Sequence, residues 1–300
     1  MKPLSESEIV AVERNLFPRV RPLVRSRLDF PWHRDRSGTI TASLVQSSQA
    51  LAVEFFGTID AVGSRDAILN AWRAELSLSV KGPWKIELEF PLPRDLLGES
   101  RPTQVDALAR GDGGLILFEC KFTEPDGGGC SQPIPLAEGA HKGIRQCDGN
   151  YVDQLNPVSG LRSRCALTGK GIRYWDLVPE VLDIDSASEH RPCPFAGGWY
   201  QWMRNLVAAR ALTHKCGVPA AFVVVYADGP FPMARKVRTE EWAALIRLTE
   251  GRAVLFRAVS YQHLHSVAAA ASSTPDRPEL DELSAWMGQK YKTVSAQVEP

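Results

Sequence analysis

The chain has 300 residues, 44% of them hydrophobic and 23% charged, which excludes an intrinsically disordered protein and predicts a globular one with one large core or two modest cores. Its formal net charge at pH 7 is zero, so any affinity for nucleic acid must come from local basic patches. It has no run of roughly 18 apolar residues that could span a membrane and its polar first residues do not resemble a signal peptide, so we expect a cytoplasmic protein with no membrane partner.

The first 62 residues are expected to form a helical, basic segment. Ser5 and Glu8 have the spacing of a capping box, and a helix is predicted from there to about Arg25. Residues 11–36 hold seven arginines against three acidic residues, which makes this the most basic part of the chain.

The rest of the chain shows both helical and strand patterns. Helices are predicted over 47–59, 64–78, 199–212 and 238–250, and strands over 84–90, 220–227 and 253–261. The strand at 84–90 alternates strictly, with these apolar residues on one side: Trp84, Ile86, Leu88 and Phe90. The tail after Ala271 should be a loop with one short helix, and His263 and His265 fall at a strand end. This order predicts an α/β fold, a mixed sheet with helices on both faces.

The same patterns divide the chain into a segment over 1–62, a core over 63–270 and a tail over 271–300. Residues 123–197 interrupt the core, because glycines, prolines and polar residues dominate there and no long periodic stretch appears. Irregular segments of this length are unusual in compact domains and tend to be functional.

Residues 105–122, VDALARGDGGLILFECKF, form a predicted hairpin whose charges need an explanation. An Asp-Gly pair at 112–113 favours a two-residue type I′ turn. That turn places Asp106 directly opposite Glu119, with Lys121 one pleat along on the same face. The other face of the hairpin is apolar and is expected to enter the core: Val105, Ala107, Ala109, Ile116, Phe118 and Cys120.

Two carboxylates directly across a ladder repel each other unless a cation lies between them. Oxygens from Asp106 and Glu119, with the carbonyl of Cys120, are the ligands that Mg²⁺ prefers. Lys121 could then orient or deprotonate a water, or stabilise charge on a phosphate. The alternative is a solvated hairpin face that carries mixed charges without a ligand.

This stretch resembles the core of the PD-(D/E)XK nuclease superfamily, the restriction-endonuclease-like fold. Asp106 matches the family's aspartate, and Glu119, Cys120 and Lys121 match its E-x-K triplet; Val105 stands where a proline often precedes the aspartate. The resemblance implies a metal-dependent nuclease that hydrolyses DNA with Mg²⁺ or Mn²⁺, in a setting such as restriction or phage defence. It leaves open a non-cleaving nucleic-acid-binding module of the same fold, an RNA-directed nuclease, and whether the protein is a homodimer.

The resemblance also suggests further site residues. Members often add a glutamate for a second metal ion; the candidates are Glu54, Glu75, Glu87 and Glu89, and Glu75 ranks first because its helix immediately precedes the predicted meander. A later helix often faces the scissile phosphate, here through Gln201 and Arg204, with Asn205 as a further candidate. The proposed contacts to the DNA backbone in the N-terminal segment are Arg19, Arg21 and Arg25.

Four of the six cysteines lie in the irregular segment: Cys130, Cys147, Cys165 and Cys193. Four thiolates could bind Zn²⁺ or hold an iron–sulfur cluster, and either would explain how such a segment stays folded. His141 and His190 could substitute as ligands. Against this, the chain has no C-x-x-C pair, and gaps of 17, 18 and 28 residues match no standard ligand spacing, so four ordinary buried thiols are an equal alternative.

Overall fold

The computed structural model describes residues 3–27, 29–78, 81–151, 153–184, 193 and 195–298. Its centre is a five-stranded sheet in the order β1-β2-β3-β6-β7. The strands are β1 (Lys81–Pro91), β2 (Gln104–Asp112), β3 (Gly114–Lys121), β6 (Ala220–Tyr226) and β7 (Val254–Ser260). The first three pair antiparallel, and β3, β6 and β7 pair parallel. The mixed sheet expected from the sequence is therefore confirmed.

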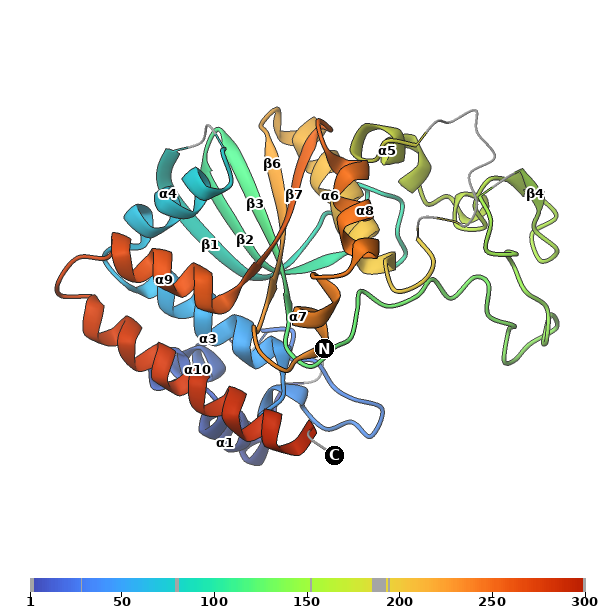
Figure 1. The fold of residues 1–300 in the computed structure, drawn as a ribbon. Helices are drawn as coiled ribbons and strands as arrows, with labels where there is room; N and C mark the ends of the chain where they lie inside the picture. The colour runs from blue at the N-terminus through green and yellow to red at the C-terminus, as the bar shows by residue number, and fades with distance from the viewer. Residues whose placement is uncertain are drawn as a thin grey trace.

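Helices cover both faces of this sheet (Figure 1). One face carries α1 (Glu6–Asn15), η1 (Pro18–Val20), α2 (Pro22–Ser26), η2 (Thr41–Ser43), α3 (Ser48–Ala61), α4 (Arg65–Glu75), α9 (Tyr261–Ala271) and α10 (Arg277–Val298). The other carries α5 (Tyr174–Val181), α6 (Tyr200–Cys216) and α8 (Glu240–Thr249), and α7 (Pro232–Lys236) packs near the end of β6. The N-terminal helices and α10 thus share one core with the sheet.

The strand β3 lies between the two cores and is buried along its whole length. Ile116, Phe118 and Cys120 enter the core under α3, while Leu115 and Leu117 enter the core under α6. The valine-rich β6 alternates between the same two cores, as a strand covered on both faces should.

Three predictions about helices were wrong. The N-terminal helix does not run to Arg25: the capping box forms at Ser5, but prolines at 18 and 22 break the chain into α1, η1 and α2. His263 and His265 lie within α9 and not at a strand end. The tail forms α10, a helix of 22 residues.

The alternation predicted for β1 fails near its end. Leu88 packs in the first core, but Phe90 packs against the second, because Glu89 between them has a left-handed φ of 50°. Val105, which pairs with Phe90, also enters the second core and not the first. The hairpin turn differs too, since Gly113 has a φ of 76° but Asp112 is not left-handed, whereas a type I′ turn needs positive φ at both.

The segment between β3 and α6 contains only short elements among its described residues. They are β4 (Gln154–Leu155), β5 (Arg162–Ser163), η3 (Thr168–Lys170) and α5, and Figure 1 shows β4 far from the central sheet. His190 lies outside the described residues. No helix in the part of the chain that the structure covers is long and apolar enough to cross a membrane.

Candidate active site

The β2–β3 hairpin brings the sequence-predicted acidic pair to one end of the sheet. Its register pairs Ala107 with Phe118 and Leu108 with Leu117, which is the predicted register, and the pairing of the two strands ends one residue short of Asp106 and Glu119. The strands are joined there by the backbone N–H of Cys120, which donates to Asp106 Oδ2 at 2.6 Å. Asp106, Glu119 and Lys121 therefore gather at the end of the hairpin away from its turn.

The carboxylate of Glu119 is buried and held by donors from two elements. Lys121 Nζ donates to its Oε1 at 2.9 Å and Asn205 Nδ2 donates to its Oε2 at 2.9 Å. Gln201 Nε2 also donates to Oε1, while its own Oε1 accepts from Lys121 at 2.8 Å. Gln201 and Asn205 are four residues apart on α6 and so share one face of the helix. The predicted role of this helix near the site has a geometric basis in these two amides.

Lys121 keeps its positive charge in this setting. Burial alone would lower its pKa, but the carboxylates of Glu119, Glu124 and Asp106 more than offset that effect, so the pKa is raised above the ordinary lysine value. A lysine in this state is suited to stabilising negative charge and is a poor proton acceptor.

A third carboxylate, Glu89, joins the cluster from β1. Its neighbours Leu88 and Phe90 pair with Ala107 and Val105, which places Glu89 across from Asp106 on the side away from β3. Burial, then the charges of Glu119 and Glu89, raise the pKa of Asp106 well above its usual range. Lys121 offsets part of this effect, and a divalent cation between the carboxylates would offset more of it.

Polar side chains from three other segments fix Glu89, which is only 2% exposed. Gln49 Nε2 of α3 donates to its Oε1 at 2.8 Å, and Gln104 Nε2 of β2 donates to its Oε2. His33 Nε2 lies 3.4 Å from the same Oε2. These partners explain how a glutamate is held in left-handed backbone, a conformation that costs on the order of 1–3 kcal/mol and clusters at functional sites.

Glu75, which the sequence ranked first as an added ligand, is not in this cluster. It ends α4, close to where β1 begins, and pairs with His263 of α9 at 3.6 Å. That is the turn end of the hairpin, because Lys81 at the start of β1 pairs with Asp112. The other two candidates also lie elsewhere: Glu54 pairs with Lys290, and Glu87 with Lys85 and Arg110.

The proposed arginine contacts to DNA are engaged within the protein. Arg19 pairs with Glu279, Arg21 donates to the carbonyl of Leu16, and Arg25 pairs with Glu6 and Glu13. Gln201 and Asn205 of α6 contact Glu119, whereas the guanidinium group of Arg204 lies over the ring of Tyr200. A role for these four arginines in DNA binding stays a prediction.

The oxygen atoms of the cluster suit a hard divalent cation. Asp106 Oδ1 accepts no hydrogen bond from the described residues, and Glu119 Oε2 accepts only one from them, so both have free lone pairs. Carboxylate oxygens with waters are what Mg²⁺ takes in proteins. No group of three or more histidine, cysteine, aspartate or glutamate side chains in the described part of the chain is arranged to hold an ion by itself, so such a cation would depend on water and substrate for its other ligands.

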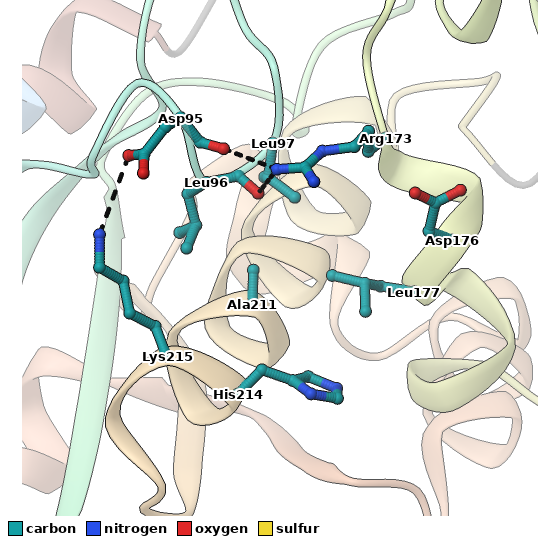
Figure 2. Close-up of a pocket in the computed structure, with 9 residues that line it drawn as sticks. All are labelled: Asp95, Leu96, Leu97, Arg173, Asp176, Leu177, Ala211, His214 and Lys215. Atoms are coloured by element: carbon teal, nitrogen blue, oxygen red, sulfur yellow. Dashed lines mark hydrogen bonds and ion pairs between the residues drawn. The ribbon is translucent and has the colours of Figure 1, made fainter.

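A separate pocket of about 460 Å³ lies at the other end of α6. Figure 2 shows Arg173 directed at the backbone carbonyls of Asp95 and Leu96, and Lys215 directed at the Asp95 side chain. His214, which also lines it, pairs with Glu180. The cations around this pocket already have partners, so it lacks the gathered carboxylates that mark the Asp106 cluster.

A family model described as Restriction Endonuclease associating with ARP matches residues 11–292. The chain belongs to this restriction endonuclease family. The match extends from α1 to α10 and so includes every residue of the Asp106 cluster. No curated protein and no solved structure matches the chain.

Proposed function

We propose that this protein is a metal-dependent nuclease of the PD-(D/E)XK type that hydrolyses phosphodiester bonds in DNA, in restriction or phage defence. The observation that carries the proposal is the meeting of Asp106 from β2 with Glu119 and Lys121 from β3 at one end of the hairpin. Membership of a restriction endonuclease family supports DNA as the substrate.

Asp106 and Glu119 would hold the Mg²⁺ ion, with Glu89 and not Glu75 as the third carboxylate beside them. Burial, and then the charges of Glu119 and Glu89, raise the pKa of Asp106, which supports a shared site for the three groups. Mg²⁺, when bound, supplies Lewis-acid stabilisation of charge on the phosphate.

The remaining polar groups would hold Glu119 in position and stabilise the charge on the phosphate. Gln201 and Asn205 fix both oxygens of Glu119, and preorganised ligands of this kind need no rearrangement when substrate arrives. Lys121, held between Glu119 and Gln201, presents an ammonium group that would stabilise the negative charge that builds up on the phosphate during hydrolysis.

The family description also names an association with ARP. We therefore propose that the protein works together with a partner of that designation, and that full activity can require it. An assay of the isolated chain should for this reason include substrate binding as well as cleavage.

The test compares wild-type protein with an Asp106→Asn variant on circular, linear and single-stranded DNA and on RNA, in Mg²⁺ or Mn²⁺ and in EDTA. Asp112→Asn is the matched control, because Asp112 lies on the same strand at the exposed turn. We expect metal-dependent DNA cutting that Asp106→Asn abolishes and Asp112→Asn retains.

Other outcomes point to the alternatives. DNA binding without cutting in either metal, with and without the ARP partner, would favour a non-cleaving module of the same fold. Cutting of RNA alone would make the protein an RNA-directed nuclease. Equal cutting by both variants would refute the assignment of Asp106.

A further inference from the structure

The stretch from 127 to 171 has little apolar core of its own. Its buried apolar side chains, within the described residues, are Tyr151, Ala166 and Leu167. The large hydrophobic side chains that are exposed in the described chain all lie in the same stretch: Ile134, Ile144, Leu155 and Leu161. Small units that cannot bury enough apolar surface are commonly held by disulfides or a metal ion.

Three of the four cysteines near this stretch adopt one local arrangement. Cys147 Sγ accepts the backbone N–H of Gly149 at 3.3 Å. Cys130 and Cys193 likewise accept the backbone N–H of the residue two positions further on. A backbone N–H directed at sulfur favours the thiolate and fixes the direction of the Cβ–Sγ bond, neither of which an ordinary buried thiol requires.

Hydrogen bonds tie the four cysteine-bearing turns to one another. The turn after Cys130 is joined to the turn before Cys147, because the backbone N–H of Gln146 donates to the Gln132 carbonyl at 3.1 Å. The backbone N–H of Cys193 donates at 2.9 Å to the carbonyl of Gly149, which lies two residues after Cys147. Lys170, in η3 just after the third, donates to Gln132 Oε1 at 2.6 Å.

The four thiols lie near one another but do not surround a common point. Cys193 lies near enough to Cys130, Cys147 and Cys165 for their charges to interact. No three of the described cysteines stand in a finished metal-binding arrangement.

We propose that Cys130, Cys147, Cys165 and Cys193 bind one zinc ion, which cross-links the irregular segment between β3 and α6. Zinc takes four thiolates in a tetrahedron, and it needs neither inorganic sulfide nor a C-x-x-C pair. Binding transfers each thiol proton to solvent as the Zn–S bonds form. The proposal does not depend on the nuclease activity proposed above.

The base of the segment joins the candidate active site. Gly127 N–H donates to the Gly198 carbonyl at 2.8 Å, and Gln201 N–H donates to the Gly127 carbonyl at 2.9 Å. The cross-link would thus hold a segment whose ends frame the first turn of α6, from which Gln201 contacts Glu119.

The first measurement is elemental analysis of the protein purified without chelator, beside Cys147→Ser and Cys165→Ser variants. Cys216→Ser is the matched control, because Cys216 is exposed at the end of α6, outside the segment. We expect about one zinc per chain in the wild type and in Cys216→Ser, and a loss of most of it in the other two. Replacement of zinc by Co²⁺ should give the absorption bands of a tetrahedral thiolate site.

A second measurement uses the wild-type protein and so tests the proposal even if the cysteine variants do not fold. Titration of the wild-type protein with an organomercurial should release zinc as four thiols react, and the zinc-free protein should be cut by protease within residues 123–197 before the sheet is cut. Zinc that survives in Cys147→Ser or Cys165→Ser, iron with sulfide in place of zinc, or no thiol-bound metal at all would each overturn the proposal.

Discussion

A buried ion pair between Lys290 and Glu54 fastens α10 to α3. Lys290 Nζ donates to Glu54 Oε1 at 2.7 Å, and the two side chains are 6% and 0% exposed. The same oxygen accepts the backbone N–H of Phe17 at 3.0 Å and Trp286 Nε1 at 2.8 Å. Replacement of Lys290 by methionine would keep most of the apolar volume and remove only the ammonium group.

Removal of one partner of a buried pair costs roughly 3–5 kcal/mol, because the other charge stays buried. We expect Lys290→Met to lower the free energy of unfolding by about 3 kcal/mol, at the low end because two neutral donors to Glu54 remain. Burial already raises the pKa of Glu54 in the wild type, and loss of the lysine raises it further. When folding raises the pKa of a carboxyl group, the folded protein becomes less stable as pH rises above the unfolded pKa of that group. The loss of unfolding free energy in Lys290→Met should therefore be larger at about pH 8 than at about pH 5.

Urea unfolding followed by tryptophan fluorescence measures this deficit, with Lys292→Met as the control. Lys292 lies on the same helix but is exposed, so its replacement should change the free energy of unfolding by less than about 0.5 kcal/mol. Equal stability of the two variants, or a deficit that grows as pH falls, would refute the account of Glu54 as a charge that depends on Lys290.

Two further substitutions test the second layer of the site and the base of the irregular segment. Asn205→Ala removes the donor to Glu119 Oε2. In a Mg²⁺ titration of cleavage it should lower the apparent affinity for Mg²⁺ by about 10- to 100-fold, whereas an unchanged titration would show that the contact is dispensable. Gly127→Ala would place a Cβ 2.9 Å from Trp202 Cδ2 and should lower the free energy of unfolding by about 1–3 kcal/mol. Gly129→Ala, with open space at its Cβ, is the control, and equal denaturation midpoints would contradict the clash.

The hairpin could be predicted from sequence because its pairing is decided locally. A two-residue connection between the strands fixes their register. The observed pairing of Ala107 with Phe118 follows from that constraint alone. The meeting of Asp106 and Glu119 at one end of the hairpin needed no knowledge of the rest of the chain.

The third carboxylate could not be predicted in the same way. In the sequence, Glu89 looks like the solvent side of an alternating strand, and its inward position depends on a left-handed φ. That conformation is stabilised by Gln49, Gln104 and His33, which are distant in sequence or lie on another strand. Proximity in the chain favoured Glu75 instead, although β1 carries the chain to the opposite end of the sheet before the site begins.

The arrangement of α6 combines the two cases. Its helical spacing puts Gln201 and Asn205 on one face, which is readable from the sequence, but only the packing of α6 against the sheet decides that this face meets Glu119. Arg204, one position away, is turned toward Tyr200. The outcome is a set of carboxylates in which burial, and then the charges of Glu119 and Glu89, raise the pKa of Asp106. Perturbed carboxyl groups of this kind gather at functional sites more often than elsewhere, which supports the proposed metal site.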